Sequence, residues 1–215
     1  MEHNFEIREI SPDEEASTAC LLAECLLTNT SYKYIVRGVD QARREDLVWF
    51  FRFRLRISRA LGGVTLGLFE NGKAISTATY GPIAAQDPPY HVLINCGILF
   101  WPFMLGFPSL FRALKLGKQM ANASYNAHGK TDWEIMMVAT SPPHQGRGLG
   151  SQVLKAALDR IRLAQRGDKT AVGLTTQLEK NVRLYTKLGF AVTAEHDLFA
   201  GTPVGFHTWI MQQDL

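Results

Sequence analysis

Residues 145–150 read Gln-Gly-Arg-Gly-Leu-Gly, with a glycine at every second position. The apolar run before them, residues 135–139, is long enough for a buried strand. After them, apolar side chains recur at spacings of three and four up to residue 164, which is typical of a helix with one buried face. Glycines between a strand and a helix let the backbone approach a ligand, and the free N–H groups of a helix start favour a phosphate. The segment predicts an anion site, with a glycine-rich turn that binds nothing as the alternative.

Two other phosphate-binding loops do not fit this segment. A P-loop requires a lysine directly after its last glycine, and here Ser151 follows Gly150. A dinucleotide-binding fingerprint requires G-x-G-x-x-G in the first crossover of a parallel unit. This segment instead reads G-x-G-x-G and lies late in the chain, so it belongs to neither class.

The segment resembles the Q/R-x-x-G-x-G/A signature of the GCN5-related N-acetyltransferase (GNAT) superfamily. A second stretch, residues 181–190, is similar to the superfamily segment that combines Asn, Tyr and Gly-Phe, and it follows about 35 residues later. Residues 141–145 and 185–194 also resemble the puromycin N-acetyltransferase-like branch. The last 85 residues or so carry the match, whereas residues 1–130 match in the order of elements more than in residue types.

The resemblance implies an acetyl-CoA-dependent N-acetyltransferase, in which a primary amine attacks the thioester directly. Such a reaction needs a holder for the pyrophosphate, a polariser for the thioester carbonyl, and control of two proton transfers. The resemblance implies that the glycine-rich turn holds the pyrophosphate, that residues 138 and 140 pair with the pantetheine arm like an added strand, and that the N–H of residue 138 polarises the carbonyl. The expected acetyl-CoA-binding residues are Val138, Ala139, Thr140, Gln145, Gly146, Arg147, Gly148, Leu149, Gly150, Ser151, Asn181 and Tyr185.

Tyr185 is the expected general acid, because it occupies the tyrosine position of the second stretch. Its ordinary pKa of about 10 keeps it protonated at neutral pH. A core tyrosine that only packs on the sheet is the alternative. Asn181 is expected to hold a main-chain or pantetheine group at a helix start, or to serve as a helix cap alone.

The general base is less clearly indicated. Glu134 comes first, because it lies four residues before Val138 on the same expected strand, so the two are expected to share a face. Some histone-type members of the superfamily use a glutamate at this offset. His128 is second, because histidine titrates near neutral pH, and His91 and His144 follow. A solvated or ion-paired Glu134, with a water chain or an amine that is already deprotonated in place of a base, is the alternative.

The composition suits one globular domain, residues 1–215, with no metal site. A net charge of +3 helps to attract an anionic cofactor but is far below a nucleic-acid footprint. The three cysteines have neither metal-ligand nor disulfide spacing, and the N-terminus lacks signal-peptide character, so a cytoplasmic location is expected. Either a monomer or a homodimer is compatible with the sequence.

Residues 92–111 are apolar over about the length of a membrane span. The stretch is interrupted by Gly97, Pro102, Gly106 and Pro108. A buried insertion is therefore expected instead of a span. Docking on a membrane surface through Trp101, Phe103 and Phe107 stays open as an alternative.

The expected fold is α+β, GNAT-like, with a twisted mixed sheet of about seven strands flanked by helices and a helical insertion at about 83–130. Strands are expected at 5–10, 64–70, 73–80, 131–140, 170–175, 190–195 and 203–212. Helices are expected at 11–27, about 40–62, 109–127, 149–164 and 180–188. An Asn-Gly pair at 71–72 predicts a two-residue hairpin turn, and a Gly-Gly pair at 62–63 predicts a helix end.

The acceptor must be inferred from the apolar surroundings of the expected site. The aromatic second helix and the insertion, with Phe100, Trp101, Phe103 and Phe107, suggest a wall for a small apolar or aromatic amine. For the helix's aromatic face, ordinary core packing is the default expectation, and a dimer contact is a further alternative. Three alternatives remain: an acyl-CoA-binding protein without catalysis, a protein or peptide N-acetyltransferase, and a membrane-associated interaction protein.

Overall fold

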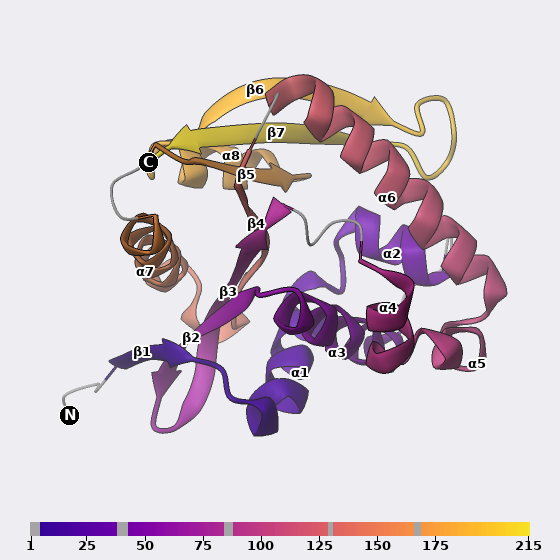
Figure 1. The fold of residues 1–215 in the computed structure, drawn as a ribbon, viewed down its shortest axis with the longest axis horizontal. Coiled ribbons are helices and arrows are strands. Elements are labelled where there is room, and N and C mark those ends of the chain that lie inside the picture. The colour runs from indigo at the N-terminus through magenta and orange to yellow at the C-terminus, as the bar shows by residue number, and fades with distance from the viewer. Residues whose placement is uncertain (1–4, 38–42, 84–87, 129–130, 166–168) are drawn as a thin grey trace.

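The computed structural model describes residues 5–37, 43–83, 88–128, 131–165 and 169–215, with the backbone alone at 125–128. Its framework is a seven-stranded sheet in the order β1-β2-β3-β4-β5-β7-β6 (Figure 1). The strands are β1 (Phe5–Glu9), β2 (Val64–Glu70), β3 (Lys73–Pro82), β4 (Trp133–Thr140), β5 (Ala171–Thr176), β6 (Ala191–Leu198) and β7 (Phe206–Asp214). Neighbouring strands are antiparallel except β4 and β5, which are parallel. The expected mixed sheet is confirmed.

Helices cover both faces of the sheet (Figure 1). On one face lie α1 (Glu15–Leu26), α2 (Thr30–Arg37) and α3 (Arg44–Ala60), which share a hydrophobic cluster with Met137 and Ala139 of β4. On the other face, α7 (Leu149–Ala164) and α8 (Glu179–Thr186) share a second cluster with Ile135 of β4. Strand β4 therefore lies between two separate cores and contributes side chains to both.

The element order agrees with the sequence prediction apart from one additional helix, α2. Helix α3 begins at Arg44, whereas the expected start near Asp40 lies outside the described residues. The last strand begins at Phe206 and not near residue 203, because a turn occupies residues 199–204. The left-handed conformations of Asn71, Gly72 and Gly62 confirm the hairpin turn and the helix end.

The insertion folds as four consecutive helical pieces. They are α4 (Tyr90–Cys96), a 3-10 turn (Ile98–Phe100), α5 (Trp101–Leu105) and α6 (Phe107–His128). Trp101 is 3% exposed, lies edge-on to three aromatic rings of α3, and donates from its indole N–H to Ser109 Oγ at 3.2 Å. The Arg112 guanidinium donates to the carbonyls of Ile35 and Val36, at the end of α2. A ring cluster and a helix-end contact therefore fasten the insertion to α2 and α3.

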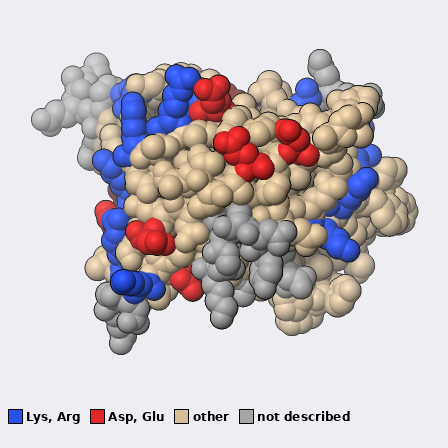
Figure 2. Space-filling model, turned by 90° about the horizontal axis from the view of Figure 1, so that it is seen from above, with Lys and Arg blue, Asp and Glu red and all other residues tan. Residues whose placement is uncertain are grey.

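Among the described residues, no helix is long and apolar enough to cross a membrane. The apolar stretch 92–111 is divided between α4, α5 and the start of α6, and Gly97 and Gly106 adopt positive φ at the breaks. Lysine, arginine and acidic side chains are interspersed over much of the face shown in Figure 2.

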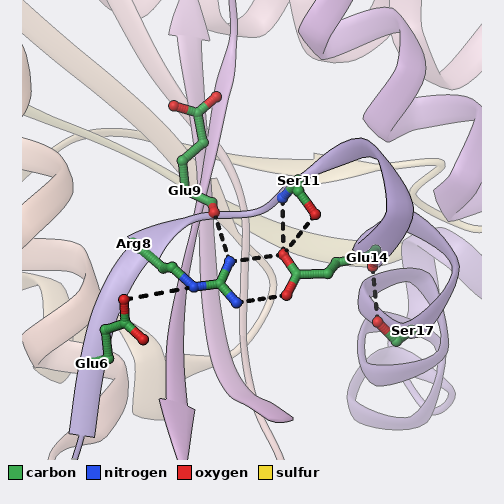
Figure 3. A network of polar contacts seen from close by, with 6 residues as sticks. All are labelled: Glu6, Arg8, Glu9, Ser11, Glu14 and Ser17. Carbon is green, nitrogen blue, oxygen red and sulfur yellow. Dashed lines mark hydrogen bonds and ion pairs between the residues drawn. The ribbon is translucent and has the colours of Figure 1, made fainter. Parts of the chain in front are cut away.

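An ion pair joins the first strand to the first helical turn (Figure 3). Arg8 on β1 donates to both carboxylate oxygens of Glu14, at 2.8 and 2.6 Å, and its guanidinium lies 3.7 Å from the centre of the Phe69 ring. The N–H and the hydroxyl of Ser11 donate to the same carboxylate, at 2.9 and 3.0 Å. The hydrogen bond from Arg8 and those from Ser11 lower the pKa of Glu14 to about 2. This carboxylate therefore stabilises the entry to α1 as an anion.

Replacement of Glu14 by Gln should lower the melting temperature at pH 7. The folded-state pKa lies near 2, below the usual 4.5, so the contribution is complete above about pH 4.5 and is lost as the pH falls towards 2. The melting curves of wild type and Glu14→Gln should therefore converge between pH 4.5 and 2. Glu6→Gln, which removes a more exposed carboxylate 3.7 Å from the same arginine, is the control and should leave the profile unchanged. A gap between wild type and Glu14→Gln that stays constant down to pH 2 would contradict this assignment.

Candidate active site

A small cavity lies where β4 and β5 separate. The two strands pair over only three residues, Trp133–Ile135 with Val172–Leu174, and then diverge. The opening holds a cavity of about 50 Å³. Its walls include Met136 and Val138 from β4, Thr175 and Thr176 from β5, and side chains from the α1–α2 region and α8. This opening is a concave site with polar walls, formed by the same strand that leads into the glycine-rich turn.

A bulge in β4 sets the direction of its side chains. Thr79 pairs with Met137 and Tyr80 with Ile135, so Met136 has no partner of its own on β3. Met136 and Met137 consequently both pack on the cluster of α1 and α3, whereas Val138 packs on the cluster of α7. Beyond the bulge, each side chain of β4 therefore faces the side of the sheet opposite to the one that regular alternation would give it. The expectation that Glu134 and Val138 share a face is therefore wrong.

The main chain of β4 beyond the bulge faces the opening. Ser141 N–H donates to Ile75 of the β3 side, and the Ala139 carbonyl accepts from Ser76 Oγ. Because main-chain groups alternate in direction along a strand, those of Val138 and Thr140 point away from β3, towards the space that β5 has left. The Thr140 carbonyl there accepts from Gln145 Nε2 at 3.0 Å and from the Cys25 thiol at 3.2 Å. An extended ligand can pair with this edge as an added strand does.

The glycine-rich turn presents main-chain donors at the start of α7. Gly146 and Gly148 adopt φ of +78° and +75°, and Gly148 caps this 16-residue helix. None of the six N–H groups from residue 146 to 151 donates a hydrogen bond to another residue of the described chain. Consecutive N–H groups at the positive end of a helix dipole form an anion-binding cradle. The geometry therefore fits a pyrophosphate.

Close packing joins this turn to the end of β4. A Cβ added at Gly150 would lie 3.0 Å from Thr140 Oγ1, which itself hydrogen-bonds Ser76 Oγ at 2.8 Å. A larger residue at position 150 would therefore push α7 away from the strand. The Arg147 guanidinium lies 5.7 Å from the centre of the Phe5 ring, at the sheet edge, and so adds positive charge beside the turn.

Tyr185 closes the far side of the cavity. It lies on α8, is 7% exposed, and packs its ring against Phe190. Burial raises the pKa of Tyr185 to about 12, with a smaller contribution from Tyr32. The phenol is therefore a neutral O–H donor at physiological pH. Asn181, one turn earlier on α8, also lines the cavity and donates from Nδ2 to Thr176 Oγ1 at 3.2 Å.

Tyr32 is a cavity residue that the sequence analysis did not identify. It lies in the first turn of α2, and its ring packs on Phe50 and Phe51 of α3. Burial raises its pKa, and Glu134 is close enough to raise it further. Asn29 begins the helix, since its Oδ1 accepts from the N–H and hydroxyl of Ser31 at 3.0 and 2.6 Å. The Asn-Thr-Ser sequence before Tyr32 is a helix-start signal that could have revealed α2.

The candidate bases are placed differently from one another. Glu134 is half-buried, and its register neighbours on β3 and β5 are both glycines, Gly81 and Gly173. His128 ends α6, and its side chain lies outside the described residues. His144 Nε2 is 3.1 Å from Glu70 Oε2, on the β2–β3 hairpin, and His91 is exposed on α4. Among the three whose side chains the structure describes, Glu134 is the one whose charge acts on a residue of the cavity wall, Tyr32.

The remaining expected features lie apart from the cavity. Five apolar residues of α3's broad face are buried in the core and thus favour ordinary packing: Leu47, Phe50, Phe51, Phe53 and Leu55. Of the expected insertion wall, Trp101 is buried against α3, while Phe100, Phe103 and Phe107 are exposed and line no part of this cavity.

All three cysteines are free thiols, and the described residues contain no cluster of potential metal ligands. Burial raises the pKa of Cys25 to about 12, so this thiol is a poor nucleophile.

Residues 37–190 match the model of the acetyltransferase (GNAT) family. The chain belongs to this family, and the family makes it an acyltransferase. A crystal structure from Corynebacterium glutamicum, described as histone acetyltransferase HPA2 and related acetyltransferase, is 16% identical, with a TM-score of 0.66 over 97% of this chain and 95% of that chain. Arylalkylamine N-acetyltransferase 2 from Aedes aegypti is 14% identical, with a TM-score of 0.64 over 98% of both chains. PaiA N-acetyltransferase from Thermoplasma acidophilum, solved with coenzyme A, is 15% identical, with a TM-score of 0.53 over 99% of both chains. At these identities the three structures establish the fold.

Replacement of Gly148 by Ala should weaken coenzyme A binding about tenfold, because a methyl group would enter the cradle and disturb its left-handed turn. Gly201, in the β6–β7 turn, is a matched control, since its φ is +76° and its surroundings are equally open. Both variants should lose about 1 kcal/mol of stability from the left-handed conformation. Calorimetric titration with coenzyme A and thermal unfolding measure the two effects. Equal affinities in Gly148→Ala and Gly201→Ala would place the anion elsewhere.

Proposed function

We propose that this protein transfers an acetyl group from acetyl-CoA to a primary amine of a small molecule, by direct attack of the amine on the thioester. The observation that carries the proposal is the presence of two neighbouring main-chain surfaces, one at Val138–Thr140 and the other at Gly146–Ser151. The first, at the open edge of β4, suits an extended pantetheine arm, and the second, at the start of α7, suits a pyrophosphate. The two surfaces are joined through Thr140, Gln145 and Gly150.

The binding residues follow from this arrangement. Val138 and Thr140 supply the main-chain groups of the strand edge, and Ala139 lies between them with its carbonyl towards β3. Asn181 lines the opening beside this edge. Gln145 fixes the Thr140 carbonyl, the N–H groups of Gly146 to Ser151 receive the pyrophosphate, and Arg147 adds charge. Acetyl-CoA, when bound, supplies an activated acyl group on a thiol that can leave. The Val138 N–H, which faces the opening, is placed to polarise the thioester carbonyl.

Proton transfer is assigned to Tyr185 in the cavity wall and to Glu134, which lies next to the wall residue Ile135 in the chain. Tyr185 donates a proton to the leaving thiolate, because its raised pKa keeps the phenol protonated. Glu134 accepts the amine proton, directly or through water, and His128 is the second candidate. The raised pKa of Cys25, the thiol beside the Thr140 carbonyl, disfavours an acetyl-cysteine intermediate and supports direct transfer.

A small amine is favoured as the acceptor because the cavity is narrow, at about 50 Å³, and carries apolar surface beside Asn29 on its α1–α2 side. Leu26 and Tyr32 line that side, and the aromatic rings of α3 support Tyr32. The resemblance of residues 141–145 and 185–194 to the puromycin N-acetyltransferase-like branch also favours a small amine. A protein acceptor is the second candidate, since one structural neighbour is described as a histone acetyltransferase.

A thiol-release assay with acetyl-CoA and a panel of amines tests the proposal. The panel should contain arylalkylamines, aliphatic polyamines and lysine peptides. Release of coenzyme A with a small amine, and an N-acetyl product of matching mass, would support it. Turnover with peptides alone would favour the protein acceptor. Coenzyme A binding without turnover on any amine would favour a binding protein without catalysis.

Replacement of Tyr185 by Phe should lower kcat by about 10²-fold at pH 7 through loss of the general acid. Coenzyme A affinity should change little, because the cradle lies on the other side of the opening. Tyr80→Phe is the control, since Tyr80 is a similarly buried tyrosine with a raised pKa that lies outside the cavity. A Tyr185→Phe variant with wild-type kcat would remove this tyrosine from the reaction.

Replacement of Glu134 by Gln should lower kcat/KM by about 10²-fold at pH 7 if this carboxylate takes the amine proton. The deficit should shrink above pH 9 or so, where more amine is already deprotonated without the enzyme's help. The pH profile of kcat/KM measures this effect. A deficit that stays constant with pH would indicate a positioning role, and a loss seen only in His128→Gln would move the role of base to that histidine.

A further inference from the structure

The insertion carries most of the exposed apolar surface of this protein. Twelve large apolar side chains are exposed in the described structure, and nine of them lie between residues 90 and 114. They are Tyr90, Ile94, Leu99, Phe100, Phe103, Met104, Phe107, Phe111 and Leu114. The five aromatic residues alone expose on the order of 700 Å².

This surface is one side of a rigid element. The opposite side of α6 is fastened by Ser109, Arg112 and buried Leu116. The solvent-facing side of α6 carries Phe107, Phe111 and Leu114. Their spacings of four and three residues place them in one stripe along the helix. The four pieces α4, the 3-10 turn, α5 and the start of α6 lie together at one end of the molecule (Figure 1). We name this surface, made by the nine side chains above, the insertion face.

The charge of the segment that carries the insertion face has one sign. Residues 88–131 contain no aspartate or glutamate, while they contain Arg112, Lys115, Lys118 and Lys130. Lys115 and Lys118 are exposed and continue the α6 stripe. In Figure 2 the right-hand end, which α5 and the start of α6 occupy in Figure 1, shows blue and tan atoms, and red lies elsewhere on the visible face. An apolar surface with lysines and without acidic residues in its own segment matches an anionic lipid surface in both respects.

The spacing along α6 fits the depth of such a contact. At 1.5 Å per residue, Lys118 lies roughly 16 Å from Phe107 along the helix axis. Apolar side chains of peripheral proteins enter a bilayer by ~5–10 Å. With Phe107 and Phe111 inserted, Lys115 and Lys118 would therefore lie at the level of the headgroups.

A basic pocket opens at the edge of the insertion face. It has a volume of about 80 Å³ and lies between α3 and α4, with Arg52, Arg56 and exposed Phe100 in its walls. Arg52, Arg56 and Arg59 surround one buried carboxylate, Glu15, at 3.5, 2.9 and 3.4 Å. Three cations with one anion leave an excess of positive charge beside the exposed ring. A lipid phosphate is complementary to this pocket.

We propose that the insertion face docks this protein on the surface of an anionic lipid bilayer, with the phenylalanines of α5 and α6 inserted and the lysines of α6 at the headgroups. The pocket lined by Arg52 and Arg56 receives a headgroup phosphate. This contact is independent of the acetyltransferase cavity, whose walls contain none of these residues. It places the enzyme where amphipathic amines accumulate.

Flotation with vesicles tests the proposal. The full chain should float with equal parts of phosphatidylcholine and phosphatidylglycerol, should not float with phosphatidylcholine alone, and should be released by salt. The double variant Phe103→Ser/Phe107→Ser should bind at least about tenfold more weakly. Lys115→Ala/Lys118→Ala should also lose about tenfold or more, and Arg52→Gln about fivefold. Leu163→Ser and Lys169→Ala, at exposed positions outside the insertion, are the matched controls and should bind as wild type.

Two other measurements make the result decisive. The phenylalanine and lysine variants should keep the wild-type melting temperature and coenzyme A affinity, because the altered side chains are exposed and remote from the cavity. Light scattering after gel filtration gives the oligomeric state. A wild-type dimer that Phe103→Ser/Phe107→Ser converts to a monomer, without vesicle binding, would assign the insertion face to a second copy and overturn the proposal. Vesicle binding unchanged by both double variants would overturn it as well.

Discussion

The separation of β4 from β5 is the constraint on which the site depends. Two parallel strands that stop pairing after three residues leave main-chain donors and acceptors without partners, and each such buried group costs ~1–3 kcal/mol unless it is satisfied. The bulge at Met136 directs the groups of Val138 and Thr140 into this gap. The chain satisfies the Thr140 carbonyl itself, through Gln145 and Cys25. The rest of the edge stays available to an extended ligand.

Two hydrophobic clusters hold the gap open. One forms between α7, α8 and the sheet, and the other between α1, α2, α3 and the opposite face. Because β4 contributes to both, neither cluster can shift without moving the strand edge. The same arrangement places two tyrosines in the cavity wall, the buried Tyr185 from α8 and the half-buried Tyr32 from α2. Each phenol is kept protonated by burial, so the cavity has two neutral donors and one nearby carboxylate.

The sequence predicted those parts of the structure that local patterns encode. Glycines at 146, 148 and 150 between an apolar run and an amphipathic run are enough to indicate the anion cradle, because the required φ values and close approach leave few other residue types. The bulge and Tyr32 were not predicted. A bulge arises from pairing between β3 and β4, which are about 50 residues apart in the chain. Tyr32 reaches the cavity only because α2 packs on Phe50 and Phe51, so its role depends on tertiary contacts.

The insertion was expected to line the acceptor site. Instead, its inner side packs on α2 and α3, and its outer side is exposed. Its inner side, through Trp101 and Arg112, covers the rings of α3 and the last carbonyls of α2. Without it, α2 would lose those partners, and Tyr32 in the first turn of that helix would lose part of its support. The insertion therefore contributes to the shape of the cavity indirectly. Its outer side takes no part in that support, because its side chains point to solvent. Packing alone does not account for nine exposed apolar residues without one acidic neighbour in the same segment, and contact with another surface does.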